Sequence, residues 1–247
     1  MNAWQIAYDI GINLFSDVVF VFGLLFVLWV LHRRQLLEAK RFFGLHQQNE
    51  IRVFISGHAH AETVTKKVVT ALEYEAAAEL KDALRHLSSR GLLPKIAKVI
   101  AGLIGQTPQF IEAVIEVSPL EHVRDLPHSG SLILVGGPLR NQLTKCVIEA
   151  GSLLKYDTTR GRFVESVDGQ YREVADSNNV AVLEKMKVNG RVIILAYGTG
   201  EKDTSIAVHH LIENWKRLDK EHLDRAFGIR LSIDSIGKAK VERVITG

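Results

Sequence analysis

An almost wholly apolar run from Ile10 to Leu31 constrains this chain more than any other feature. Its centre, from Val18 to Leu31, contains no polar residue, and a basic cluster that includes Arg33 follows at once. A helix of about 20 residues is long enough to cross a hydrocarbon core of about 30 Å. We therefore predict a transmembrane helix within residues 1–35, which continues as a charged helical stalk over residues 36–49.

The charges that flank this run indicate its orientation. A secretory signal peptide carries its positive charge before the apolar run and a small-residue cleavage site after it. Residues 1–9 instead contain an acid and no Lys or Arg, whereas basic residues continue behind the run as far as Arg41. A core helix of a soluble domain is less uniformly apolar. Because Lys and Arg favour the cytoplasmic side, we expect a single-pass protein of the inner (cell) membrane, with its N-terminus outside and residues 50–247 in the cytoplasm.

Three polar residues, Asn13, Ser16 and Asp17, interrupt the outer part of the run at spacings of three and four. A carboxylate within hydrocarbon is costly unless it is paired, protonated or facing water. Either Asp17 lies near enough to the interface to be hydrated, or the three residues form a helix face that meets neighbouring helices. One helix cannot enclose a pore, so a pore or a coupled switch requires several copies. We expect a homo-oligomer embedded in the lipid bilayer.

Composition sets broader limits on the remainder of the chain. About 200 residues follow the apolar run, which is a normal size for one domain. The 31 Lys and Arg residues nearly balance the 28 Asp and Glu residues, so the charge does not indicate a nucleic-acid polymer as a partner. The single cysteine, Cys146, cannot form an internal disulfide, in agreement with a reducing cytosol.

The pattern of residues 50–247 predicts an α/β domain, because apolar runs at strand spacing alternate with segments at helical spacing. We expect strands at 51–56, 110–117, 131–135, 180–188 and 191–196, helices at 72–87, 94–104, 141–150 and 204–218, and hairpins at 163–173 and 229–245. The dipeptide Asn189-Gly190 predicts a tight hairpin, and this hairpin makes the sheet mixed. The expected fold class is α/β, with one N-terminal transmembrane helix followed by a Rossmann-like domain with a mixed sheet.

Two glycine-rich loops follow predicted strands and precede predicted helices. The candidate ligand-binding residues are Gly136, Gly137, Pro138, Arg140, Asn141 and Thr144 in the first loop, Gly198, Thr199, Gly200 and Thr204 in the second, and Ser56 and Gly57 as a third wall. Open α/β sheets bind ligands at the carboxyl ends of strands, and helix N-termini favour anions. A nucleotide-like ligand, such as a cyclic oligonucleotide, fits this chemistry. The alternative is that both loops are tight turns with capping residues, since neither matches a P-loop or a GxGxxG fingerprint.

Two acids near the start of the helix expected at 72–87, Glu73 and Glu75, are candidate catalytic carboxylates. Some N-glycosidic enzymes carry their carboxylate at such a position, so an enzyme that hydrolyses a nucleotide or an N-glycosidic bond is an alternative function. Acids are also favoured at helix N-termini without any catalytic role. The pairs His58 with His60 and His209 with His210 have no companion Cys or carboxylate at metal-ligand spacing. We expect no metal and no other cofactor.

The segments GGPLRNQLT and RVIILAYGTGEKDTSIAVHHL, within residues 131–218, resemble a pair of motifs in prokaryotic α/β domains. Such domains occur in archaeal surface-layer-like proteins and in membrane-tethered proteins of unassigned role, so this resemblance implies a fold more than an activity. The layout of one span and one cytosolic domain is similar to that of CARF-type membrane effectors, which sense cyclic nucleotides in antiviral defense. The anchor, the polar helix face and the two glycine loops together lead us to expect a membrane-anchored sensor that couples a nucleotide-like ligand to an oligomeric transmembrane helix, with a structural surface-associated protein as a further alternative.

Overall fold

The structure of the chain is a computed structural model, and it describes residues 3–45, 49–60, 63–88, 92–103, 105, 111–119, 126–127, 130–157, 162–167, 170–173, 179–233 and 239–247. The chain divides into two compact units. One unit comprises Met1–Leu37 and His86–Phe110, and the other comprises Glu38–Arg85 and Ile111–Gly247. The expected α/β class is confirmed, since an apolar N-terminal helix precedes a mixed sheet of seven strands within the described residues.

Helix α1 (Ala3–Phe42) is continuous over 40 residues. Its segment Leu14–Phe42 is the one candidate among the described residues that is long and apolar enough to cross a membrane, judged by length and composition. The side chains of Phe20 and Phe22 in this segment are 71% and 62% exposed. A core helix of a soluble protein would bury such side chains, so the exposure agrees with a helix that meets lipid.

The polar residues of this helix are only partly described. Ser16 and Asp17 have exposed side chains, whereas the side chain of Asn13 lies outside the described part.

The second helix of this unit is α3 (Leu92–Leu103). It agrees with the helix expected at 94–104, and its start two residues before the predicted boundary places Pro94 in the first turn, where a missing N–H costs little.

The main sheet has the order β12-β11-β9-β10-β5-β1-β4 in the described part of the chain. Its strands are β1 (Glu50–Ile55), β4 (Glu112–Val117), β5 (Ser131–Val135), β9 (Val180–Val188), β10 (Arg191–Gly198), β11 (Phe227–Ile233) and β12 (Ala239–Thr246). Strands β10, β5, β1 and β4 are parallel to one another, whereas β9, β11 and β12 join antiparallel. The carboxyl ends of β1, β5 and β10 therefore meet at one edge of the sheet.

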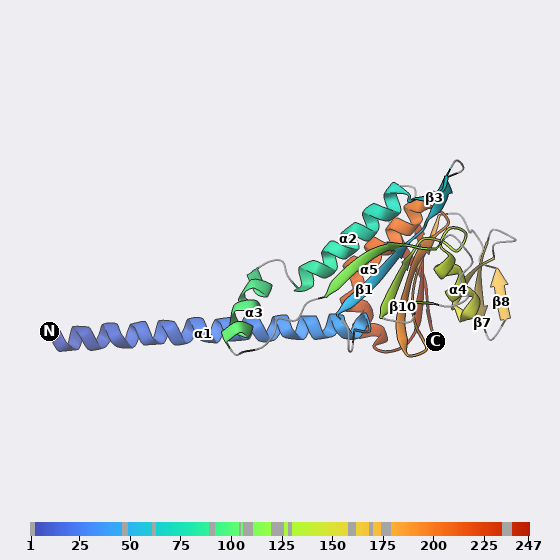
Figure 1. Cartoon of the computed structure of the whole chain (residues 1–247). Helices are drawn as coiled ribbons and strands as arrows, with labels where there is room; N and C mark the ends of the chain where they lie inside the picture. Colours follow the sequence, from blue (N-terminus) through green and yellow to red (C-terminus); the bar gives the residue numbers. More distant parts are fainter. Residues whose placement is uncertain are drawn as a thin grey trace. The chain divides into compact units, whose positions relative to one another are not determined.

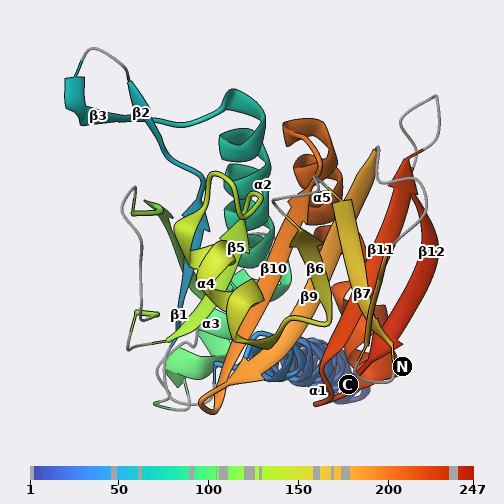
Figure 2. The same cartoon turned by 90° about the vertical axis from the view of Figure 1, so that its right-hand side faces the viewer.

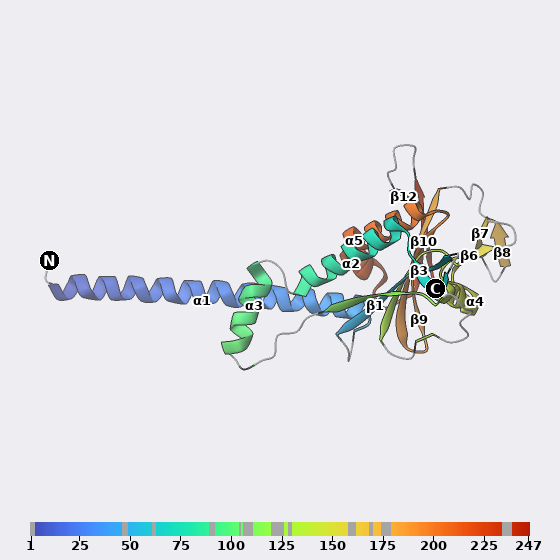
Figure 3. The ribbon, with the colours of Figure 1, turned by 45° about the horizontal axis from the view of Figure 1, so that its top comes forward.

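Two layers cover the main sheet. Helices α2 (Ala71–Ser88) and α5 (Glu201–His222) lie on one face, and α4 (Gln142–Gly151) lies on the other (Figures 1 and 2). The small sheet of β6 (Leu154–Asp157), β7 (Arg162–Val167) and β8 (Gln170–Glu173) lies on the same side as α4 (Figure 3). Alternate residues of the inner strands face the two layers, which explains why strand β5 is buried along its whole length.

The end of α1 packs within the second unit. Phe42 is fully buried, with its ring 6.1 Å from that of Trp215 in α5 and 6.4 Å from that of Phe227 in β11. Arg41 forms an ion pair with the buried carboxylate of Asp219 in α5. The stalk was expected over residues 36–49. Of this segment, the structure describes a helix up to Phe42 and buried side chains near its end, whereas residues 46–48 lie outside the described part.

Several smaller elements were not predicted. Strands β2 (His58–His60) and β3 (Thr63–Val68) pair in a stretch whose pattern indicated no single element, and β6 was also missed. The expected hairpins at 163–173 and 229–245 are confirmed by the antiparallel pairs β7–β8 and β11–β12, although residues 168–169 and 234–238 between the paired strands lie outside the described part.

Candidate functional site

The connections of neighbouring strands β5 and β10 leave the sheet in opposite directions. Strand β5 leads into α4 on one face, whereas β10 leads into α5 on the other face (Figure 1). In open α/β sheets, ligands bind in the crevice outside the carboxyl ends of strands at such a topological switch point. The two predicted glycine loops begin there, at Gly136 after β5 and at Gly198, the last residue of β10.

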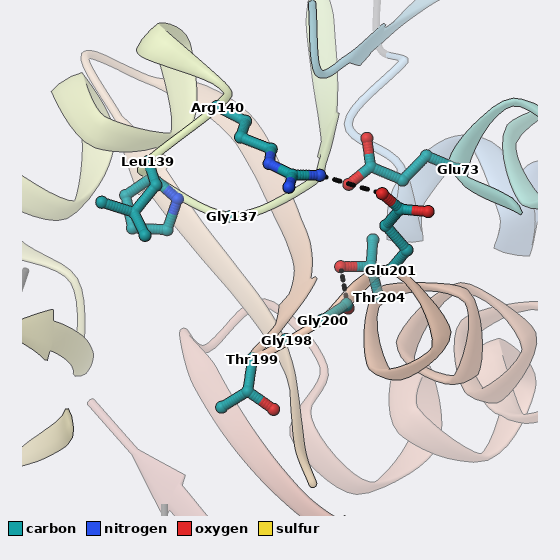
Figure 4. A pocket seen from close by; sticks show the side chains of 10 residues that line it. Glu73, Gly137, Leu139, Arg140, Gly198, Thr199, Gly200, Glu201 and Thr204 are labelled. Atoms are coloured by element: carbon teal, nitrogen blue, oxygen red, sulfur yellow. Dashed lines mark hydrogen bonds and ion pairs between the residues drawn. The ribbon is translucent and has the colours of Figure 1, made fainter. Parts of the chain in front are cut away.

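A cleft of about 340 Å³ lies at this point (Figure 4). The residues that line it are Glu73, Gly137, Pro138, Leu139, Arg140, Gly198, Thr199, Gly200, Glu201 and Thr204. The structure thus brings together seven of the twelve predicted ligand-binding residues from both glycine loops. It adds Leu139, Glu201 and Glu73, of which Glu73 had been considered only as a catalytic carboxylate.

The first loop is held in place by Asn141, which does not line the cleft. This fully buried residue is the N-cap of α4, and its side-chain oxygen accepts hydrogen bonds from the N–H groups of Leu143 and Thr144, both at 3.2 Å. Its amide nitrogen donates to the carbonyl of Val135, at 2.9 Å, and to that of Phe54, at 3.3 Å. The hydrogen-bonding groups of Asn141 therefore join β5, β1 and α4. Thr144, in the first turn of α4, is fully buried and does not line the cleft either.

The second loop ends in a tight cap at the start of α5. The Asp203 carboxylate accepts a hydrogen bond from the N–H of Gly200, at 3.0 Å, and another from the Thr199 hydroxyl. A side chain at Gly198 would overlap Asp203, so the close approach of this strand end to α5 requires glycine. At Gly200 the backbone is extended, and a Cβ would lie at an ordinary 3.6 Å from Asp203. Gly200 is thus not needed for the turn itself.

An ion pair connects the two loops across the cleft. Arg140 Nη1 in the first loop lies 2.9 Å from Glu201 Oε1 in the first turn of α5 (Figure 4). Both side chains are partly exposed, so the pair contributes little to stability. A ligand that carries a negative charge competes with Glu201 for the Arg140 guanidinium, because the guanidinium binds carboxylates and phosphates with similar geometry.

Glu73 provides a buried carboxyl group at the wall of the cleft. The residue is only 3% exposed, and burial raises its pKa; the neighbouring Glu201 adds to the rise, whereas Ser56 and Arg140 oppose it. Ser56 Oγ and Glu73 Oε2 are both buried without a hydrogen-bond partner among the described residues.

Gly136 packs against this carboxyl group. Its φ is +106°, and a Cβ at this position would lie 3.1 and 3.2 Å from the two carboxyl oxygens of Glu73 and would overlap Ser56 Oγ. Glycine is therefore required here for both the backbone conformation and the close approach. Ser56 and Gly57, which follow β1, are buried and do not line the cleft.

The other predicted chemical groups lie elsewhere. Glu75 is exposed and does not line the cleft. His209 Nε2 lies 2.6 Å from the Glu79 carboxylate and connects α5 to α2. Among the described residues, no group of three or more His, Cys, Asp or Glu side chains is arranged to hold a metal ion.

Two comparisons with known proteins bear on this chain. The family model described as "S-layer like family, outer domain" matches residues 52–215, which include both glycine loops and Glu73. No curated protein matches the chain. The family match confirms the surface-layer part of the resemblance, whereas the likeness to CARF-type effectors rests on the layout of the sequence alone.

Proposed function

The chain belongs to the S-layer-like family, and we propose that it is a membrane-anchored domain that binds a small nucleotide-like ligand between its two glycine loops. One observation carries the proposal: both loops and a buried carboxyl group line one cleft at the switch point between β5 and β10. Ligands of α/β sheets bind at such points. The backbone of Gly137 and Gly200 and the start of α5 suit a phosphoryl group.

The proposed function includes coupling between the ligand and the membrane helix. Helix α5 begins at the cleft with Glu201, and its last turns contact the end of α1 through Asp219 and Trp215. The distance along the helix from Glu201 to Asp219 is about 27 Å, at 1.5 Å per residue. A ligand that moves the start of α5 therefore changes the packing of Arg41 and Phe42. In a homo-oligomer, this movement reaches the neighbouring α1 helices.

Calorimetric titration of the full chain in detergent micelles tests ligand binding. The probes are nucleoside mono- and diphosphates and cyclic mono- and dinucleotides, with inorganic phosphate as the reference. We expect at least one nucleotide to bind more tightly than phosphate. No heat from any probe at millimolar concentration would refute the proposal.

Glycine variants separate binding from folding. Gly137→Val and Gly200→Val should weaken binding at least about tenfold, because each adds bulk where the ligand's phosphoryl group meets the backbone. Both should fold, since a Cβ at either glycine meets its nearest neighbour at an ordinary 3.5 or 3.6 Å. Gly102→Val in α3 is the matched control, because the space around that position is open. Equal losses of thermal stability and binding would mean that the loops are only tight turns.

The side of the membrane distinguishes this function from a structural role. The basic cluster behind the apolar run favours a cytoplasmic domain, whereas the family description suggests a protein associated with the cell surface. Protease treatment of intact cells and of inverted vesicles provides the test. We expect cleavage of the domain only in inverted vesicles. Cleavage in intact cells would support the alternative of a structural surface-associated protein.

Glu73 supports a second candidate, an enzyme that hydrolyses a nucleotide or its N-glycosidic bond. A buried carboxyl group with a raised pKa at the wall of a cleft is suited to general acid catalysis. Glu75 is exposed, which leaves Glu73 as the carboxylate to test. Release of base from nucleosides or NAD by the purified protein, lost in Glu73→Gln, would establish this activity. Binding without turnover would leave a sensor.

A further inference from the structure

Two buried polar groups beside the cleft have no hydrogen-bond partner among the described residues. They are Ser56 Oγ at the end of β1 and Glu73 Oε2 in α2, in residues that are 0% and 3% exposed. Most buried polar side-chain atoms in proteins are hydrogen-bonded, because an unpaired group loses its hydration without compensation. Glu73 lines the cleft, so a bound molecule can supply the missing partner.

The position of the Glu73 carboxyl group is closely defined. Gly136 packs on one side, where even a Cβ would lie within 3.2 Å of both carboxyl oxygens, and Ser56 Oγ lies next to it. The Arg140–Glu201 ion pair lies on the cleft side (Figure 4). Side chains held by such packing present their polar atoms in one fixed geometry, which is the condition for specific recognition.

The charges that line the described part of the cleft limit the ligand. They are the guanidinium of Arg140, already paired with Glu201, and the carboxyl groups of Glu201 and Glu73. Two carboxyl groups and one guanidinium disfavour a chain of phosphates. They suit one phosphoryl group near Gly200, with a hydrogen-bond donor of the ligand turned toward Glu73, since a carboxyl group accepts hydrogen bonds in both its ionised and its protonated form.

We infer that Glu73 determines the specificity of the cleft and selects ligands that combine a single phosphoryl group with a hydroxyl group that donates to its carboxyl oxygen. The sugar of a nucleoside monophosphate has this combination. The inference rests on the proposed ligand-binding function and adds to it the part of the ligand that is recognised and the residue that recognises it.

The test compares two ligands that differ only in sugar hydroxyl groups. Adenosine 5′-monophosphate and its 2′,3′-dideoxy analogue are titrated into the full chain in detergent micelles. We expect the dideoxy analogue to bind about tenfold more weakly, which corresponds to about 1.4 kcal/mol. In Glu73→Gln, an amide replaces the carboxyl group at nearly constant size. In this variant, the ratio of the dissociation constants of the two ligands should fall below about threefold. Glu75→Gln is the matched control, since Glu75 is exposed on the same helix, and it should keep the full ratio.

The outcomes distinguish this inference from the proposed function. Equal affinity of the two ligands for the unmodified protein would overturn the inference while ligand binding stands. The inference would also be overturned if Glu73→Gln kept both the tenfold ratio of dissociation constants and an unchanged melting temperature. The ligand comparison on the unmodified protein decides the question even where the variant does not fold. Absence of binding by every nucleotide would instead refute the proposed function.

Discussion

Replacement of Glu184 by Gln should stabilise the protein above neutral pH and leave its stability nearly unchanged in acid. Glu184 in β9 is fully buried, with Oε2 2.7 Å from Ser152 Oγ and Oε1 2.5 Å from the backbone nitrogen of Leu153. The Ser152 hydroxyl donates its single proton to the Leu154 carbonyl, which also accepts from Tyr197. The Ser152 hydroxyl is also placed to donate to Glu184 Oε2, but its single proton cannot serve both acceptors, so a protonated Glu184 supplies the donor that is otherwise missing. A glutamine amide can donate at the same place.

The magnitude follows from the pKa of this group. Burial is the main cause that raises the pKa of Glu184 from 4.5 to about 7. Between these values the folded chain retains a proton that the unfolded chain releases, so the free energy of unfolding falls as the pH rises through this window. The shift corresponds to about 3 kcal/mol above pH 7, at about 1.4 kcal/mol per pKa unit. For a chain of this size, 1 kcal/mol changes the melting temperature by about 2–4 °C.

Thermal unfolding of the full chain in micelles between pH 5 and pH 8, followed by tryptophan fluorescence, measures the effect. We expect Glu184→Gln to melt within about 2 °C of the unmodified protein at pH 5 and at least about 6 °C above it at pH 8. Glu149→Gln, at an exposed position on α4, should show no such divergence. A difference between the two proteins that stays constant over this pH range would refute a protonated Glu184 in the folded state.

Three further predictions concern the loop, the end of α1 and the membrane segment. Gly136→Ala should lower the free energy of unfolding by about 2 kcal/mol or more, because Gly136 has a positive φ and contacts the buried carboxyl group. Gly137→Ala should lower it far less, and chemical denaturation compares the two variants. Asp219→Asn should lower stability by about 2 kcal/mol, because the buried carboxylate loses its charged hydrogen bond to Arg41, and the loss should be smaller in an Arg41→Gln background. Asp17→Leu should keep the protein in the membrane but change its cross-linked oligomers; an unchanged cross-linking pattern would make α1 a plain anchor.

The sequence predicted the elements whose patterns are local. The Asn189-Gly190 dipeptide predicted a tight hairpin, and the structure confirms it: both residues have positive φ, at 51° and 77°, and Val188 pairs with Arg191. Strand β6 was missed because its four residues are too few to show a period. The start of α5 was placed three residues late, because its N-cap is Gly200, which has no side chain to act as a capping signal.

The candidate site was predicted in part, because local patterns mark its loops but do not show which side chains line the cleft. Glycines that end strands mark the loops, so Gly137, Gly198 and Gly200 could be chosen from the sequence, and all three line the cleft. Asn141 was chosen by the same pattern, but its hydrogen bonds are all internal. Glu201 was missed because it lies between the second glycine loop and the helix expected at 204–218. An acid is common at the start of a helix without any function.

By itself, the sequence determined the apolar helix, the α/β class and the two glycine loops, because each depends on residues that are close together in the chain. Only the tertiary structure decided that Ser56, Glu73, Gly136 and the start of α5 meet at one place. Their proximity depends on the strand order β10-β5-β1 and on the opposite directions in which α4 and α5 leave the sheet. No local pattern encodes that order, since it results from which strand surfaces pack together when the whole domain buries its apolar residues.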